Sequence, residues 1–185
     1  MSRERLFSTY QIFIIAILTI LQFTIILDFM VLSPLGAQLM PALKITTAQF
    51  GLVVSAYAFS AGASGLLAAG FADRFDRKRL LLFFCAGFIL GTFFCGIAPT
   101  YGLLLAARTV TGIFGGVIGS VIFAITTDLF DIKVRGRVMG YVQMVFAASQ
   151  VLGLPAGLYV SNLWDWHAPF RLIVVLSIPL WVLIY

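Results

Sequence analysis

Long runs of apolar residues, separated by short polar segments, set the pattern of this sequence. Six runs follow one another along the chain: residues 11–35, 50–72, 80–98, 103–127, 138–160 and 169–185. Most of them reach about 20 residues, enough for a helix to cross about 30 Å of hydrocarbon. Strands of a membrane barrel would be shorter and would alternate in polarity. Because lipid offers no hydrogen-bond partner to the backbone, the pattern predicts an all-α membrane protein with six transmembrane helices.

Composition also indicates lipid as the solvent. Of the 185 residues, 62% are hydrophobic and 10% are charged, whereas a soluble domain has about 45–50% apolar and about 25% charged residues. We therefore interpret residues 1–185 as one transmembrane domain with the lipid bilayer as a partner. No Gly-rich phosphate loop, zinc-protease motif or catalytic-triad spacing is present in the sequence. The sequence predicts no enzyme activity, no cofactor and no metal site.

Positive charge is concentrated in alternate loops. The formal net charge is +5. Nine basic residues precede the first run or separate the second from the third and the fourth from the fifth: Arg3, Arg5, Arg74, Arg77, Lys78, Arg79, Lys133, Arg135 and Arg137. Such residues mark the cytoplasmic side of a membrane protein. We therefore expect an integral multi-pass protein of a bacterial inner (plasma) membrane, with both termini cytoplasmic and no nucleic-acid partner.

Small residues four positions apart predict close contacts between helices. Gly112 and Gly116 have this spacing in the fourth run, and Gly153 and Gly157 have it in the fifth. Such pairs let helix backbones approach closely in lipid. Pro155 lies between the second pair and should kink its helix. We expect these five residues to serve in helix packing or kinking; the same holds for the pairs Gly87 and Gly91, and Gly115 and Gly119.

Two charged residues lie inside apolar runs. A charge at the centre of a transmembrane helix costs at least about 2.5–3.5 kcal/mol on insertion scales. Asp28 precedes Pro34 by six residues and Arg108 follows Tyr101 by seven, so each should lie roughly 10 Å from the outer end of its helix. Burial disfavours a charged carboxylate and a nearby arginine favours it. We predict that Asp28 takes up and releases a proton and that Arg108 tunes it. The alternatives are a static ion pair or side chains that extend their charged ends to the membrane interface.

Other polar residues on the runs carry weaker predictions. Gln22 and Gln143 should line a substrate cavity or bond neighbouring helices. Cys85 and Cys95 lie ten residues apart in one run, roughly 15 Å along a helix, which is too far for a disulfide. We expect both cysteines to be packed residues.

Several stretches resemble motifs of the major facilitator superfamily, and specifically of its N-terminal six-helix half. The family's loop between helices two and three has the pattern Gly-x-x-x-Asp-Arg-x-Gly-Arg-Lys. Residues 69–78 read AGFADRFDRK, with Ala69 and Asp76 in place of the glycines. Its fourth helix often has Arg-x-x-x-Gly, and residues 108–112 read RTVTG. The stretch LDFMVLSPLG resembles drug/proton antiporters, whereas GLPAG, residues 153–157, resembles the sugar- and metabolite-efflux branch.

The resemblance implies a fold and a gating motif. The fold is the N-terminal half of the family architecture, six helices in a 3+3 repeat, with a second six-helix half as the missing partner. In the family, charged residues of the loop join an acid at the inner end of helix four and latch the cytoplasmic side in the outward-open state. The corresponding residues here are Asp73, Arg74, Arg77, Lys78 and Asp128.

These features favour a secondary transporter, or its N-terminal half, that exports a small molecule by alternating access with proton coupling. One alternative is a truncated, non-transporting membrane fragment that acts only through helix–helix association. A second is a facilitator or importer without proton coupling. An intramembrane enzyme is a further class, but the sequence offers no nucleophile–base pair or metal set for it.

Overall fold

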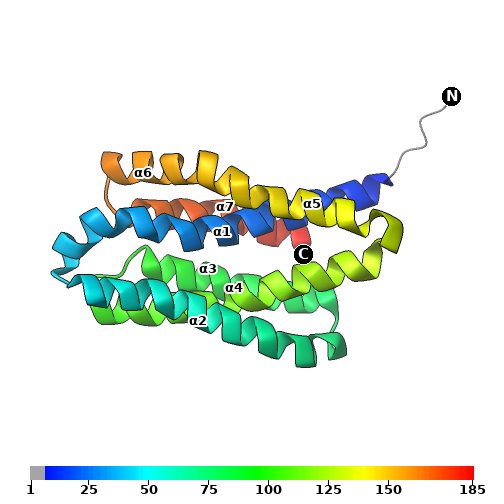
Figure 1. Ribbon diagram of the computed structural model, residues 1–185, viewed down its shortest axis with the longest axis horizontal. Coiled ribbons are helices and arrows are strands. Elements are labelled where there is room, and N and C mark those ends of the chain that lie inside the picture. Colours follow the sequence, from blue (N-terminus) through cyan, green and yellow to red (C-terminus); the bar gives the residue numbers. More distant parts are fainter. Residues whose placement is uncertain (1–6) are drawn as a thin grey trace.

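The computed structural model describes residues 7–185, apart from the side chains of Ala69, Phe71 and Asp73. Every regular element in this part of the chain is helical. Successive long helices run antiparallel to one another and form a bundle (Figure 1). The elements are α1 (Thr9–Leu43), α2 (Thr47–Phe71), η1 (Ala72–Arg74), α3 (Arg77–Cys95), α4 (Tyr101–Leu129), α5 (Ile132–Ala148), η2 (Ser149–Gly153), α6 (Leu154–Leu163) and α7 (Ala168–Ile184).

The described helices match the predicted all-α class. Five helical segments are long and apolar enough to cross a membrane: α1, α2, α3, α4 and the continuous segment Ile132–Leu163. That segment comprises α5, η2 and α6. The sixth predicted span corresponds to α7, which is apolar but shorter, with 17 residues. Within the described residues, the length and composition of a membrane-crossing helix are therefore confirmed for five of the six predicted spans.

Polar residues fix where the helices begin. The side chains of Ser8, Thr46, Asp76, Thr100 and Asp131 each accept a hydrogen bond from a backbone N–H of the first turn that follows. Such caps satisfy donors that the helix itself leaves unpaired. Asp76 adopts φ −60° and ψ 124°, so the chain needs no glycine here for a left-handed turn. The cap places Arg77 and Lys78 in the first turn of α3 and not in the preceding loop.

Helix α1 is longer than the apolar pattern predicts. It continues through Pro34 and Pro41 to Leu43 and ends at Lys44, whose φ of 51° is left-handed. Asp28 is therefore 15 residues, roughly 22 Å, from the end of its helix, and the predicted depth of roughly 10 Å is wrong. Proline does not break α1 because neighbouring helices support such positions in membrane proteins.

Glycines set the closest contacts of the bundle. A Cβ added to Gly112 would lie 2.6 Å from the Tyr57 carbonyl oxygen of α2, and one at Gly116 would meet the Ala61 carbonyl oxygen. Gly153 and Gly157 approach α1 in the same way, each with a side-chain atom of Leu27 or Val31 at 2.7 Å. Gly119 has open space around it. The packing prediction is therefore wrong for Gly119, because this position faces the open space of a cavity and not the backbone of another helix.

The fifth predicted span contains an irregular segment. Residues Ser149–Gly153 form a π-helical turn, and Pro155 follows as the second residue of α6. Proline cannot donate to the helical ladder, and a π turn is one of the devices that absorb such a break. The predicted interruption at Pro155 thus takes the form of a π turn that joins α5 to α6.

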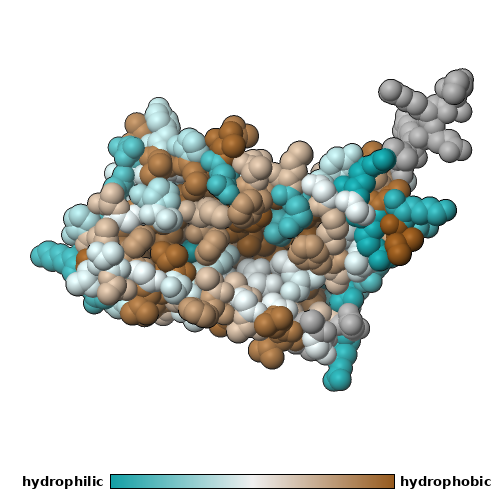
Figure 2. Space-filling model, viewed as in Figure 1, coloured by the Kyte–Doolittle hydropathy of each residue, from teal (hydrophilic) through white to brown (hydrophobic). Residues whose placement is uncertain are grey.

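The surface has apolar sides and polar ends. On the face shown in Figure 2, brown and pale residues dominate the sides of the bundle, and most teal residues gather at its two ends. Large apolar side chains such as Phe59, Leu66 and Leu67 are more than 70% exposed. A bundle with such sides is suited to lipid and not to water.

Candidate functional site: a buried ion pair beside a cavity

Asp28 and Arg108 form an ion pair inside the bundle. The Nη1 atom of Arg108, on α4, donates to Asp28 Oδ2 of α1 at 2.7 Å and to the Asp28 backbone carbonyl at 3.2 Å. Both side chains are 0% exposed. The sequence predicted that these residues could pair across the bundle, and this geometry is present.

Residues of three further helices surround the pair. Thr92 Oγ1 of α3 donates to Asp28 Oδ1 at 3.3 Å. The ring of Tyr57, on α2, has its centroid 4.3 Å from Arg108 Cζ, and the ring of Phe170 on α7 lies at 6.0 Å. A guanidinium over an aromatic face is attracted by the ring quadrupole. Five helices therefore converge on two opposite charges, which makes the pair a structural centre of the bundle.

The pair is only partly satisfied by hydrogen bonds. Arg108 Nε and Nη2 are buried and make no hydrogen bond within the described residues, and the Tyr57 hydroxyl is in the same state. A buried polar group without a partner costs about 1–3 kcal/mol. Native proteins rarely keep several such groups together without a reason. The unpaired donors therefore indicate that this centre has a functional role and not only a structural one.

A cavity of about 570 Å³ lies against this centre. Its walls come from α1, α2, α4 and α5, and its aromatic members are Phe29, Tyr57, Phe123 and Phe146. The described residues that line it include no charged side chain, since Asp28 and Arg108 lie behind Tyr57 and do not line it. The cavity is therefore a mainly apolar surface with an ion pair sealed behind one wall.

The two predicted cavity glutamines differ in position. Gln22 lines the cavity, and its buried Oε1 has no hydrogen-bond partner in the described part of the chain. Gln143 is exposed on α5 and is not among the lining residues. The buried positions of α5 are Val138, Val142 and Val145, so Gln143 lies on a different face of this helix. Gln143 therefore does not line this cavity, and its role in a substrate cavity or a bond between helices stays a prediction.

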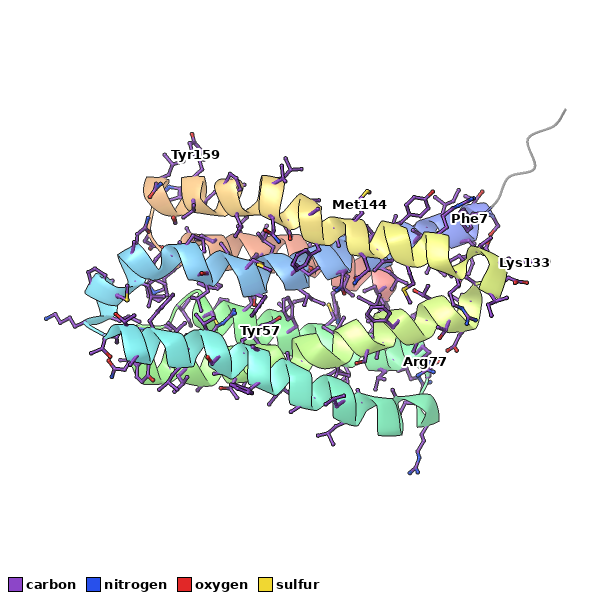
Figure 3. All side chains as sticks on the ribbon, viewed as in Figure 1. Phe7, Tyr57, Arg77, Lys133, Met144 and Tyr159 are labelled. Atoms are coloured by element: carbon purple, nitrogen blue, oxygen red, sulfur yellow. The ribbon has the colours of Figure 1, made fainter. Side chains whose placement is uncertain are left out.

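A second charged cluster lies at one end of the bundle. Arg77 Nε donates to Asp128 Oδ2 at 3.0 Å, joining the start of α3 to the end of α4. Figure 3 shows Arg77 and Lys133 at this same end, which we call the basic end. Arg74 and Lys78 are exposed, and the predicted contact of Asp73 lies outside the described side chains. A cavity of about 510 Å³ also opens here, lined in part by Arg77, Lys78 and Asp128.

Thr92, Tyr57 and Phe170 of the central site were not singled out from the sequence. Thr92 is one of many hydroxyl residues on the helices, and nothing in its local sequence sets it apart. Tyr57 carried a usable signal, because it lies in the middle of an apolar run and not near a membrane interface, where tyrosine is usually enriched. A hydroxyl-bearing ring at such depth needs a polar partner or a special role.

Comparison with known proteins agrees with this architecture. The sequence profile of the Major Facilitator Superfamily matches residues 18–185. The chain belongs to this superfamily. Its members are transporters and not an enzyme class, and the chain has the multi-span membrane fold of this family.

Individual relatives and a solved structure give further detail. The chain is 34% identical over 158 residues to the "Uncharacterized MFS-type transporter YceJ" of Bacillus subtilis, covering 85% of this chain and 40% of the relative. It is 34% identical over 122 residues to "Multidrug resistance protein 3" of the same organism, covering 66% of this chain and 24% of the relative. The crystal structure of a bacterial homologue of the human lysosomal transporter Spinster, inward-facing and unoccupied, has a TM-score of 0.83 at 19% identity, over 96% of this chain and 43% of that one. The chain therefore spans less than half the length of these proteins.

Proposed function

We propose that this chain forms the N-terminal six-helix half, with a 3+3 repeat, of a secondary transporter that exports a small molecule in exchange for protons. The observation that carries the proposal is the Asp28–Arg108 pair, which is fully buried beside the cavity. Its partner would be a second six-helix half, and the substrate would bind between the two halves. The similarity to a multidrug resistance protein supports export as the direction.

The pair has the properties that proton coupling requires. An ionisable residue inside a transmembrane bundle is costly and is usually functional. A carboxylate opposite a fixed arginine is stable when charged, whereas a buried carboxyl without its cation favours the neutral form. A change that separates Asp28 Oδ2 from Arg108 Nη1 therefore favours protonation, and a change that restores the contact favours release. Alternation between such states couples proton binding to a conformational cycle.

The charged cluster at the basic end fits a gating role in the same cycle. We propose that Arg77 and Asp128, with Asp73, Arg74 and Lys78 nearby in sequence, hold this end closed in one state of the transporter. The side chain of Arg77 is 25% exposed and that of Asp128 is 52% exposed. A pair this exposed contributes little on its own, about 0–1 kcal/mol. Such a weak contact is suited to a latch that must open in every cycle.

Substitution of Asp28 tests the proposed function. Asp28→Asn removes the ionisable group and nearly keeps its size, with one acceptor oxygen replaced by an NH2 donor. In the full-length transporter, reconstituted in liposomes with an imposed pH gradient, we expect Asp28→Asn to abolish gradient-driven ethidium efflux. Ethidium exchange without a gradient should persist, because only proton coupling is lost.

The matched control is Asp165→Asn, at an exposed acid in the α6–α7 connection. It should leave efflux close to that of the wild type. Each variant must also elute as a folded, detergent-solubilised protein. Normal gradient-driven efflux by Asp28→Asn would show that the proton is carried elsewhere and that Asp28 serves in packing.

A further inference from the structure

Tyr57 stands between the cavity and the ion pair. It lines the cavity together with Phe29, and it is only 4% exposed. Its ring also faces the guanidinium of Arg108, 4.3 Å from Cζ. Figure 3 shows Tyr57 in the middle of the bundle, far from the basic end. Tyr57 therefore lines the cavity and at the same time contacts the buried guanidinium of Arg108.

The ring is held by packing and not by a hydrogen bond. Its hydroxyl is buried and makes no hydrogen bond to any described residue. The ring of Phe29 packs against it with centroids 5.3 Å apart and an angle of 31° between the planes. A Tyr side chain that lacks a polar anchor resists displacement less than an anchored one.

Gly115 of α4 gives the hydroxyl its space. A Cβ added to Gly115 would lie 2.8 Å from the Tyr57 hydroxyl oxygen. Even an alanine at this position would therefore push the ring from its present place. The ring therefore fits closely against Gly115. No hydrogen bond from its hydroxyl fixes it in place.

We propose that Tyr57 is a lid whose displacement by a molecule in the cavity exposes the Asp28–Arg108 pair to water. This inference rests on the proposed function and adds the residue that links its two sites. A flat apolar or aromatic molecule is the occupant that the walls favour, because Phe29 and Tyr57 offer ring faces and the described lining offers no charge. Tyr57 acts as a positioning residue, since it controls access to Asp28 and takes no part in the proton transfer.

The step that the lid controls is a proton transfer to water. With the ring in place, the pair is 0% exposed and no water reaches Asp28. The step starts from a protonated Asp28 that is separated from Arg108, a state other than the paired one in this structure. When the ring moves, water reaches Asp28, its O–H bond breaks, water accepts the proton as hydronium, and the carboxylate takes up the contact with Arg108 Nη1. The titratable groups that face the ring are Asp28 and Arg108, with the Cys95 thiol as a further neighbour. Substrate entry is thereby coupled to proton release.

Passive proton leak through the full-length transporter tests the lid. The protein is reconstituted in liposomes with pyranine trapped inside, a pH gradient is imposed, and no transport substrate is added. Tyr57→Ala removes the ring and its contact with Arg108, so we expect proton leak to rise about tenfold. Tyr57→Phe keeps the ring and should match the wild type. Tyr57→Ala combined with Asp28→Asn should return to the wild-type leak, because the path then lacks its proton carrier.

Labelling of Asp28 by dicyclohexylcarbodiimide, measured by mass spectrometry, reports access to the carboxyl group independently of transport. Tyr57→Ala should increase this labelling, and Tyr159→Ala, an exposed tyrosine of α6, should not. Gly115→Ala is a second route to the same state, since its methyl group displaces the ring. In the wild-type background, Gly115→Ala should increase the labelling of Asp28. In the Tyr57→Phe background, which lacks the hydroxyl, Gly115→Ala should leave the labelling unchanged.

The outcomes separate the lid from the proposed function. Unchanged labelling in both Tyr57→Ala and Gly115→Ala would overturn the lid, whatever the leak. Leak that rises equally in Tyr57→Phe, or that persists with Asp28→Asn, would also overturn it. Increased labelling without increased leak would support the lid and contradict proton transport through Asp28.

Discussion

At the scale of single residues, the buried pair dominates the energetics of this chain. Arg108 supplies the only cation that the structure places against Asp28, among the described side chains. Removing one member of a buried pair leaves a buried charge without compensation and costs about 3–5 kcal/mol. Replacing both members with polar, uncharged residues avoids that cost. The double substitution should therefore cost less stability than the single one.

We predict that Arg108→Gln lowers the free energy of unfolding of the full-length protein in detergent by about 3–5 kcal/mol. The double variant Asp28→Asn with Arg108→Gln should recover much of this loss, because no charge is then buried alone. Thermal unfolding of the four proteins of the cycle measures the coupling. Arg137→Gln, at an exposed residue of α5, is the control and should change stability little. Additive losses in the double variant would show that the two residues are not coupled.

At the scale of elements, contact between α2 and α4 depends on the absence of side chains. A Cβ at Gly116 would meet the backbone of Ala61, whereas a Cβ at Gly119, one turn later on α4, would meet nothing. Backbone atoms cannot rotate away from an added methyl group as a side chain can. Substitution of either glycine by alanine makes the same chemical change on the same helix, but only at Gly116 does the added methyl group meet another helix.

We predict that Gly116→Ala destabilises the protein by about 1–3 kcal/mol, because α2 and α4 must separate to accommodate the methyl group. Gly119→Ala should be neutral or slightly stabilising, since alanine favours helix over glycine by up to about 1 kcal/mol. Thermal unfolding in the same detergent measures both variants. Equal destabilisation would indicate that glycine at these positions serves helix flexibility and not the α2–α4 contact.

At the scale of the whole molecule, charge is distributed along the bundle axis. Lys133 and Arg77 lie at the basic end (Figure 3), and the α1–α2 connection that contains Lys44 lies at the opposite end (Figure 1). Positively charged loops remain on the cytoplasmic side during insertion. The arrangement therefore favours one orientation of the protein, with the basic end in the cytoplasm.

We predict that single cysteines at exposed Lys44 and Lys133 react from opposite sides of the membrane. A membrane-impermeant maleimide applied to intact cells should label Lys44→Cys in the full-length protein with its other cysteines replaced. It should label Lys133→Cys only after the membrane is permeabilised. The reverse pattern would place the basic end outside and would contradict cytoplasmic termini.

The sequence by itself determined the class of this protein and the location of its helices along the chain. Those properties follow from local hydropathy, because a run of about 20 apolar residues in lipid has no stable form except helix. It also identified Asp28 and Arg108, since charge in such a run is costly wherever it points. The polar caps, including the cap at Asp76, became evident only in the structure.

Only the tertiary structure decided which faces of the helices meet. Hydropathy does not fix how a helix is rotated when most of its surface is apolar, because lipid and protein neighbours are then nearly equivalent solvents. For that reason Gly116 meets the backbone of a neighbouring helix and Gly119 does not, and Gln22 lines the cavity whereas Gln143 does not. The same relation between helices brings Tyr57 of α2 onto Arg108 of α4, 51 positions apart, a distance over which no local pattern could connect them.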